Sequence, residues 1–331
     1  MLLELEEPVD TLKPIVRRKR LRILTWHVHG NYLYYLTQAP HDFFLVTEAG
    51  HPPGHAGKVG ALPWGDNVQE VAIDAVAGSQ FDCVVIQSRA HWFGDRQTVL
   101  TEAQRNLPTI VIEHDTPYDD AVMCRHWMDD PRALLVHVTP FNALMWDHVD
   151  TTVRVIEHGV VVPPDVTYRG DLARGITVVN HLARRGRRLG ADLFERARQR
   201  VPLDLVGMEA EASGGLGEIR NPDLPDFIAS YRFFFHPVRW TSLGLAVIEA
   251  MAIGMPVIGL ASTELSTVID SGRNGYIDTS FEALISAMDE LLADPRQAKV
   301  WGDAARRTVE ERFSIDRFVA DWNEAFAMVT A

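Results

Sequence analysis

Short, continuously apolar segments recur along the first half of the chain. Six of them precede residue 161, at 21–28, 43–50, 81–88, 108–115, 133–139 and 153–160. They are rich in β-branched residues and do not alternate with polar ones, which is typical of parallel strands buried on both faces. Helices are expected between several of them, for example at 66–78 and 91–106. Strands that alternate with helices predict a doubly wound α/β sheet.

A segment rich in Pro, Asp and Gly, at 161–175, interrupts this series and reads as a linker. A second series follows it, with strands expected at 176–182, 203–207, 232–237 and 256–260 and helices at 188–200, 224–231, 244–253 and 264–271. The chain of 331 residues is long enough for two domains. We therefore expect two α/β domains facing a cleft, with the boundaries arm 1–20, first domain 21–162, linker 163–175, second domain 176–312 and terminal helix 313–331.

The last segment has helical periodicity. Its apolar residues stand at 315, 318, 319, 322, 326 and 329, which places them on one face of an amphipathic helix. Ser314 is expected to cap the start of this helix.

Charge and cysteine content restrict the class of protein. The net charge of −13 argues against broad nucleic-acid binding, which needs a surplus of cations. The basic segment 17–22 reads as a solvated arm, with contact to an anionic membrane as the alternative. The two cysteines, Cys83 and Cys124, imply no disulfide framework and fit a reducing compartment. With no signal-peptide pattern and no apolar span of about 18 residues, a cytoplasmic protein is expected, alternatively one at the inner face of the membrane.

Two loops that follow strands of the first domain contain candidate ligand-binding residues. Ligands of α/β sheets bind beyond the carboxyl ends of the strands. Gly30 and Asn31 follow the first strand, without the GxGxxG of a dinucleotide-binding loop. His114 follows the strand at 108–113 and could donate to a ligand hydroxyl or carbonyl. The pairs in 27–29 and 51–55 resemble metal ligands, but no second cluster stands at a matching spacing, so no metal site is expected.

A lone carboxylate, Glu249, lies in an apolar helical segment of the second domain. An unpaired buried carboxylate costs several kcal/mol, roughly as much as a domain can lose, so this acid should serve a ligand or face water. The loop before the helix would direct the amides of Ser242, Leu243, Gly244 and Leu245 at an anion. Glu249 could accept hydrogen bonds from two neighbouring hydroxyls, as a ribose offers. The hypothesis is that Glu249 binds the ribose of a nucleotide.

An arginine-rich loop, 181–192, follows the first strand of the second domain. It contains Arg184, Arg185 and Arg188, and arginine matches phosphate oxygens with two parallel hydrogen bonds. The alternative is a solvated basic loop. A diphosphate between these guanidinium groups and the amides of Ser242 to Leu245 would be stabilised, also as a leaving group.

The segment 237–259 resembles the retaining glycosyltransferases of family 4, which have the GT-B fold. The matching positions of its motif are Gly244, Leu245, Glu249, Ala250, Met251, Ala252, Gly254, Pro256 and Val257. Weaker similarities stand at 156–160, 203–207, 268–277 and 311–322. The resemblance covers the second half of the chain well and the first half in outline. It implies two Rossmann-like domains and a C-terminal helix that crosses back to the first one.

The resemblance also implies a function. Family 4 enzymes transfer a sugar from a nucleoside-diphosphate sugar with retention of configuration and without an obligatory metal. The first domain would bind a carbohydrate or lipid-linked acceptor and the second the donor, with a UDP- or GDP-sugar as co-substrate and no other cofactor. By position, Glu249 would bind the donor ribose, His114 would lie near the transferred sugar, and Gly30 would face the diphosphate. Polysaccharide assembly is the usual setting of such enzymes.

Three positions depart from the family pattern. Thr241 stands where the family has a second glutamate, His181 stands at the usual arginine, and Leu189 at the usual lysine before Gly190. Thr241 or the nearby amides could replace the glutamate, and Arg184, Arg185 or Arg188 could replace the cations. A catalytically weakened nucleotide-sugar-binding or scaffold protein is the alternative. A phosphorylase of this fold would need a pyridoxal-phosphate lysine, and the lysines, at 13, 19, 58 and 299, are absent from the strand-end loops of the second domain.

Overall fold

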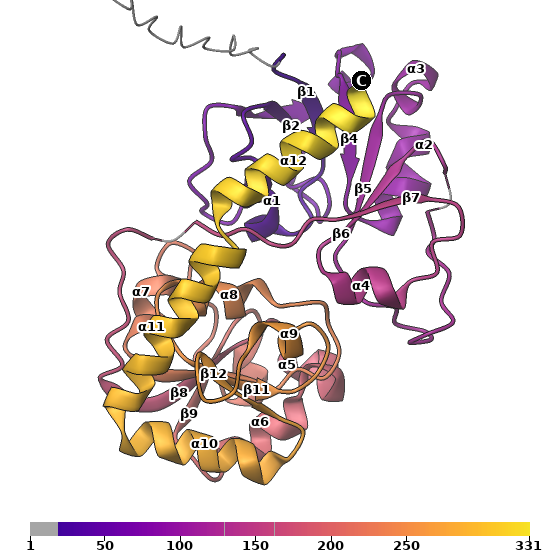
Figure 1. Cartoon of the computed structure of the whole chain (residues 1–331). Coiled ribbons are helices and arrows are strands. Elements are labelled where there is room, and N and C mark those ends of the chain that lie inside the picture. The colour runs from indigo at the N-terminus through magenta and orange to yellow at the C-terminus, as the bar shows by residue number, and fades with distance from the viewer. Residues whose placement is uncertain (1–18, 129, 162) are drawn as a thin grey trace, which may run out of the picture.

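The computed structural model describes residues 19–128, 130–161 and 163–331. Of the expected arm at 1–20, residues 1–18 lie outside the described residues, as do the first two cations of the basic segment 17–22. Figure 1 shows two lobes, each built around one sheet, with the last helix reaching from the lower lobe to the upper one.

The upper lobe is built on a seven-stranded parallel sheet in the order β3-β2-β1-β4-β5-β6-β7. The strands are β1 Arg22–Thr25, β2 Asp42–Thr47, β3 Val68–Ala72, β4 Cys83–Ile86, β5 Thr109–Glu113, β6 Leu134–His137 and β7 Thr152–Val155. Its helical elements are α1 Gly30–Leu36, η1 Ile73–Gly78, η2 His91–Asp95, α2 Arg96–Thr98, α3 Glu102–Arg105 and α4 Pro140–Met145. Neighbouring residues of β1 face different cores, since Ile23 packs in one apolar cluster and Leu24 in another. This confirms a sheet covered on both faces.

The lower lobe has a five-stranded parallel sheet in the order β12-β11-β10-β8-β9. Its strands are β8 Leu172–Val178, β9 Leu203–Val206, β10 Tyr231–His236, β11 Val257–Leu260 and β12 Gly275–Asp278. The helical elements are α5 Leu182–Arg185, η3 Gly186–Leu189, α6 Ala191–Arg198, η4 Ala210–Ser213, α7 Leu224–Ala229, α8 Leu245–Ala252, α9 Leu265–Val268, α10 Phe281–Ala293 and α11 Pro295–Arg312, and the last helix of the chain is α12 Ile315–Thr330. Along β10, Phe234 packs in the cluster of α8, whereas Phe233 and Phe235 pack with α6 and α10. The predicted doubly wound α/β architecture is therefore confirmed in both lobes.

Several predicted boundaries are wrong in detail. Residues 66–78 form β3 and a 3-10 turn instead of a helix, and 91–106 form three short helical pieces. β8 begins at Leu172, inside the expected linker 163–175. Its first residues are exposed, and Arg174 pairs with Asp204, so this part of the strand lacks an apolar signature.

Helix α12 packs on the upper lobe. Phe318, Trp322 and Phe326 are buried, and the Phe326 ring lies 5.1 Å from that of His41. Ser314 caps the helix by accepting a hydrogen bond from the amide of Arg317, as predicted. The helix therefore ties the end of the chain to α1 and to the first sheet, which helps to fix the two lobes relative to each other.

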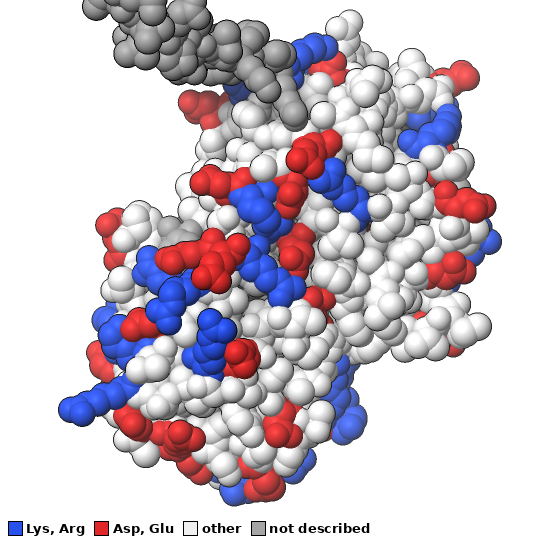
Figure 2. All heavy atoms as spheres, viewed as in Figure 1, with Lys and Arg blue, Asp and Glu red and all other residues white. Residues whose placement is uncertain are grey.

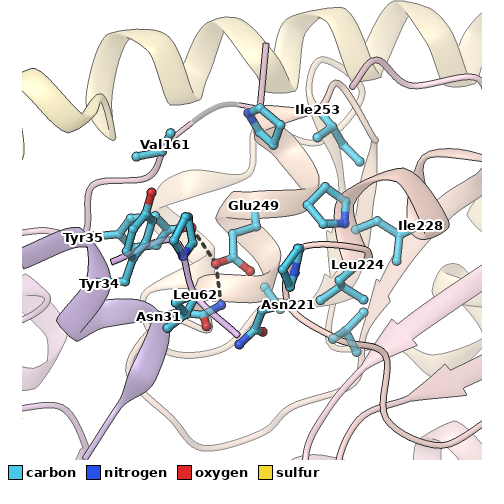
Figure 3. A pocket seen from close by; sticks show the side chains of 16 residues that line it. Asn31, Tyr34, Tyr35, Leu62, Val161, Asn221, Leu224, Ile228, Glu249 and Ile253 are labelled. Carbon is cyan, nitrogen blue, oxygen red and sulfur yellow. Dashed lines mark hydrogen bonds between the residues drawn. The ribbon is translucent and has the colours of Figure 1, made fainter. Parts of the chain in front are cut away.

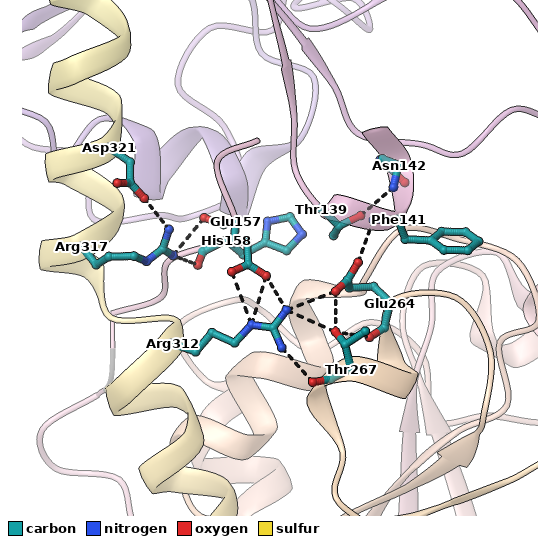
Figure 4. Close-up of polar contacts among 10 residues, drawn as sticks. All are labelled: Thr139, Phe141, Asn142, Glu157, His158, Glu264, Thr267, Arg312, Arg317 and Asp321. Atoms are coloured by element: carbon teal, nitrogen blue, oxygen red, sulfur yellow. Dashed lines mark hydrogen bonds and ion pairs between the residues drawn. The ribbon is translucent and has the colours of Figure 1, made fainter. Parts of the chain in front are cut away.

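A polar cluster also joins the lobes, at the end of α11 (Figure 4). Arg312 donates to Glu157, at 2.6 Å, and to Glu264, at 3.1 Å. The other oxygen of Glu264 accepts from the amide of Phe141, at 2.9 Å, in the first turn of α4. Glu264 of the lower lobe thus caps a helix of the upper lobe. We refer to Arg312, Glu157, Glu264 and Thr267 as the Arg312 cluster.

Charges on the surface are largely paired. On the face shown in Figure 2, acidic and basic side chains are interspersed over the lower lobe and the junction of the lobes. Examples of pairs are Arg154 with Glu324 and Arg317 with Asp321. In the basic segment, Lys19 and Arg20 pair with Asp82 and Asp42, which leaves less positive charge free for an anionic membrane.

Gly302, inside α11, allows a close helix contact. A Cβ at this position would lie 1.9 Å from the carbonyl oxygen of Gly254, which is backbone and cannot rotate away. Alanine favours a helix by about 1 kcal/mol over glycine, but overpacking costs about 1 to 3 kcal/mol. We expect Gly302→Ala to lower the free energy of unfolding in urea. Asp303→Ala, at the next and exposed position, should change it by less than about 0.5 kcal/mol. Equal stability of the two variants would contradict this contact.

Candidate functional site: a cleft between the lobes

The largest cavity beside the expected donor loops lies where the strand order of both sheets reverses. In such sheets the reversal point opens a crevice at the carboxyl ends of the strands. Here the loops after β1, β8, β9 and β10 surround a cleft of about 500 Å³. Five predicted donor-site residues line it: Gly30, Asn31, Gly244, Leu245 and Glu249. The fold therefore brings together residues from positions about 215 apart in the sequence.

Glu249 lies at the centre of this arrangement (Figure 3). Its Oε1 accepts hydrogen bonds from Asn31 Nδ2, at 3.0 Å, and from Tyr35 Oη, at 2.9 Å. Both donors belong to α1 of the upper lobe, so this carboxylate bridges the lobes. No hydrogen bond to Oε2 is found within the described ranges. The free oxygen of Glu249 can accept from a ligand in the cleft.

The environment of Glu249 changes its acidity. Burial raises the pKa of this carboxyl, and the hydrogen bonds from Asn31 and Tyr35 oppose the rise. Burial thus makes the charged form of the carboxylate less favourable. A ligand hydroxyl that donates a hydrogen bond to the carboxylate would stabilise this charged form.

The start of α8 faces the same cleft. Gly244 is the N-cap residue and provides no side-chain cap, so the first-turn amides of α8 have no such acceptor. The carbonyl of Leu243 accepts from His158 Nε2, at 3.1 Å, which fixes the loop from behind. Ser242 and Leu243 are buried, Thr241 is half-buried, and none of the three lines the cleft. The helix start, rather than the loop before it, is what the cleft exposes to a ligand.

A smaller apolar pocket of about 210 Å³ adjoins the cleft on the other side of Glu249 (Figure 3). Its apolar lining comes from both lobes and includes Tyr34, Leu62, Pro222, Ile228 and Ile253. Asn31 and Glu249 line both cavities. The carboxylate therefore stands at the boundary between a polar cleft and an apolar pocket.

His114 lies in a separate cavity of the upper lobe, of about 300 Å³. Its Nε2 lies 3.0 Å from Gln87 Oε1, and its ring centre is 4.1 Å from that of His29. Burial lowers the pKa of His114 well below its ordinary value, so the imidazole is neutral at pH 7. A neutral imidazole can exchange hydrogen bonds with a sugar hydroxyl without adding charge.

His29 is a site residue that the sequence did not single out. It lines both the cleft and the cavity of His114. The signal that could have found it is its position between β1 and Gly30, at the carboxyl end of the central strand. In the sequence, His29 stands out only as one of the two histidines in 27–29 that resemble metal ligands.

The arginine-rich loop does not line the cleft. His181 lies 3.0 Å from Glu209, and Arg184 also approaches that carboxylate. Arg188 stacks on Tyr118 of the upper lobe, 4.0 Å from the ring centre, and donates to its hydroxyl. Arg185 influences the pKa of both His29 and Tyr118, which places its charge beside the gap between the lobes. In the described part of the chain, no lysine or arginine contributes to the lining of the cleft.

The chain was compared with known proteins. The family model "Glycosyl transferases group 1" matches residues 214–308. A GDP-mannose-dependent alpha-(1-6)-phosphatidylinositol monomannoside mannosyltransferase of Mycolicibacterium smegmatis is 34% identical over 160 residues, 39% of this chain and 42% of the relative. A sucrose synthase of Denitrovibrio acetiphilus is 26% identical over 139 residues, 38% of this chain and 18% of the relative. The chain thus spans less than half the length of these two curated relatives.

Solved structures match over nearly the whole chain. Sucrose-phosphate synthase from Thermosynechococcus elongatus has a TM-score of 0.70 at 17% identity, covering 94% of this chain and 99% of that one. HepE of Anabaena, in complex with UDP-glucose, has a TM-score of 0.70 at 12% identity, covering 93% and 100%. This chain has the GT-B fold, and part of it is similar to the group 1 glycosyltransferases. The predicted GT-B fold and the resemblance to family 4 are confirmed, and the matched segment 214–308 contains Glu249.

Within this GT-B protein, no helix of the described residues combines the length and the apolar character needed to cross a membrane. Cys83 is buried, and burial raises the pKa of its thiol to about 12. Neither cysteine forms a disulfide.

Proposed function

We propose that this GT-B protein is a retaining glycosyltransferase that moves a hexose from a nucleoside-diphosphate sugar to a glycan, glycolipid or small-molecule acceptor. The main support is the position of Glu249, which lines the cleft at the reversal points of both sheets and whose Oε2 has no hydrogen bond among the described residues. A ribose hydroxyl donating to this oxygen would satisfy it, and the uncapped start of α8 would accept the diphosphate.

We propose roles for four further residues. Arg185 and Arg188 would supply positive charge to the diphosphate from the edge of the cleft, after Arg188 leaves the ring of Tyr118. The transferred sugar would lie near His29 and His114, because His29 borders both the donor cleft and the cavity of the upper lobe. That cavity, which Trp127, Trp146 and Tyr118 also line, would receive the acceptor.

The stereochemical course and the metal requirement are part of the proposal. We propose attack of the acceptor on the face from which the diphosphate leaves, through an oxocarbenium-like transition state, without a metal ion at the diphosphate. Closure of the lobes would exclude water and limit hydrolysis of the donor.

One observation favours the alternative, a catalytically weakened protein that binds a nucleotide sugar. The described residues that line the cleft include no lysine or arginine, and Thr241 replaces a carboxylate. Without cations next to it, a leaving diphosphate is less stabilised. UDP- and GDP-sugars remain the donors we propose for either reading.

The test is a donor and acceptor screen with the full chain, followed by NMR of the product. We expect transfer from one UDP- or GDP-sugar, with the anomeric configuration of the donor retained and the rate unchanged by added Mg²⁺. Inversion would exclude the retaining assignment, and strict dependence on Mg²⁺ would exclude the metal-independent step. Nucleotide binding without turnover on any acceptor would favour the weakened protein.

A further inference from the structure

Three potential metal ligands meet in the upper lobe, outside the cleft and the other cavities described above. They are His55, His91 and Asp95, and their ligand atoms all lie within 4.8 Å of one another. Asp95 Oδ2 is 2.6 Å from His55 Nε2 and 3.7 Å from His91 Nε2. His91 is buried and the other two are half-buried. His55 comes from the loop after β2, whereas His91 and Asp95 come from the turn η2.

Each imidazole is held by its second ring nitrogen. His55 Nδ1 lies 3.3 Å from Glu48 Oε2, and His91 Nδ1 lies 2.8 Å from Ser88 Oγ. Both rings therefore present Nε2 to the same point beside Asp95. This is the arrangement seen at metal sites, where the nitrogen that does not bind the metal donates to a carboxylate or hydroxyl and so fixes the ring.

The surroundings also fix the His91 ring. Trp26 stacks on it, with ring centres 5.2 Å apart and planes at 21°. Gly54 approaches from the loop, and a Cβ there would lie 2.9 Å from His91 Nε2 at a backbone φ of +91°. A side chain at this position would crowd the nitrogen, and the backbone of Gly54 also forms a hydrogen bond with the His91 ring.

We propose that His55, His91 and Asp95 bind one divalent transition-metal ion, Zn²⁺ by preference, outside the donor cleft. Two imidazoles and one carboxylate are ligands that Zn²⁺ accepts, with water as the fourth. At Zn²⁺ bond lengths of 2.0–2.2 Å, tetrahedral ligand atoms are separated by about 3.3 Å. The separations of 2.6 and 3.7 Å from Asp95 Oδ2 bracket this value and all ligand atoms lie within 4.8 Å, so shifts of roughly 1 Å would complete the site.

The site would fasten a loop that forms part of the donor cleft. The loop between β2 and β3 passes from His55 to Gly60 and Leu62, which line the cleft. The carbonyl of Gly57 accepts from His27 Nδ1, at 2.8 Å, and the carbonyl of Gly60 accepts from Asn221 of the lower lobe, at 3.2 Å. The ion would stabilise this wall without touching the diphosphate. From the sequence no metal site is expected, because no second cluster of ligands stands at a matching spacing. The three ligands proposed here are far apart in the sequence, since Asp95 stands 40 residues after His55.

The experiment uses the full chain, stripped with a chelator and titrated with Co²⁺ and then Zn²⁺. We expect one Co²⁺ per chain, with the visible absorption of a tetrahedral site, displacement by Zn²⁺, and a higher melting temperature with either ion. Asp95→Asn keeps the size of the side chain and should lower Co²⁺ affinity by more than about 100-fold, because even residues outside the coordination sphere contribute 10- to 100-fold.

A matched variant distinguishes this site from surface histidines. His51→Gln alters an exposed histidine of the same loop that lies outside the cluster, and it should bind Co²⁺ as the wild type does. Glu48→Gln should lower affinity by about 10- to 100-fold while leaving all three ligands in place. Failure of the wild type to bind either ion, or equal binding by Asp95→Asn and wild type, would overturn the proposal and leave His55 as an ordinary hydrogen-bonding partner of Asp95.

Discussion

Replacing Glu249 with Ala is expected to lower nucleoside-diphosphate affinity by roughly 10- to 100-fold, because hydrogen bonds to a charged group contribute about 1.5–3 kcal/mol. The carboxylate lines the cleft, with one oxygen bound by α1 and no hydrogen bond to the other among the described residues. The substitution removes the acceptor for the ribose and also the contact that links the lobes. Calorimetric titration with UDP and GDP measures the change, and turnover should fall at least as far.

Two variants separate the two effects of Glu249. Tyr35→Phe removes only one donor to Oε1 and leaves the carboxylate available to a ligand, so affinity should fall by only a few-fold. Glu249→Gln keeps the shape but removes the charge. Equal affinity losses in Tyr35→Phe and Glu249→Ala would mean that Glu249 acts by joining the lobes rather than by binding the ligand.

The pH dependence of binding follows from the raised pKa of Glu249. A ribose hydroxyl donates a stronger hydrogen bond to the charged carboxylate than to the protonated acid. Affinity should therefore rise as the pH increases through the raised pKa of this group, above its ordinary value of 4.5. For stability the sign is opposite, since a raised folded-state pKa favours the folded protein at low pH and this contribution is lost as the pH rises. In Glu249→Gln both pH dependences should disappear.

Replacing Arg312 with Met is expected to destabilise the chain by about 2 to 4 kcal/mol, because it leaves the buried carboxylate of Glu264 without its cation. The guanidinium is partly exposed, which keeps the expected value at the lower part of the range for buried pairs. Glu264 would also lose its fixed position as the acceptor for the amide of Phe141, so the contact between the lobes should loosen. Urea unfolding measures the first effect, and small-angle scattering of the native protein measures the second.

The control for Arg312 lies on the same helix. Arg306 pairs with Glu310 on the exposed face of α11, and Arg306→Met should cost less than about 0.5 kcal/mol. If both variants lost the same stability, the Arg312 cluster would be only a surface ion pair.

Long apolar segments predicted the fold because parallel strands buried on both faces need them. Phe234 and its neighbours in β10, and Ile110 to Ile112 in β5, were recognisable for this reason. β3 is not apparent in the sequence because its Gln69 and Glu70 face solvent. The start of β8 is not apparent because it contains Arg174, which forms an ion pair with Asp204. Residues at sheet edges and at the starts of strands are stabilised by polar pairs rather than by burial. Such residues are not apolar, so a search for apolar segments in the sequence does not find them.

The candidate site was predictable only in part. Gly30 and Asn31 begin the helix after β1, Glu249 is an acid within an apolar helix, and the cleft does bring them together. The hydrogen bond from Tyr35 to Glu249 and the position of His29 between two cavities depend on how the two lobes pack together. A local sequence pattern does not predict this packing. The arginine-rich loop 181–192 shows this limit most clearly. Its composition favours a phosphate site, but in the structure Arg184 approaches Glu209 and Arg188 stacks on Tyr118.

The central claim is that the cleft beside Glu249 binds a nucleoside diphosphate, and a calorimetric titration of the wild-type chain with UDP, GDP and ADP tests it most directly. We predict that UDP or GDP binds with one site per chain, and that saturation stabilises the protein by about 2.7 kcal/mol at one hundred times the Kd. Absence of heat and of stabilisation with all three nucleotides would contradict the assignment of this cleft.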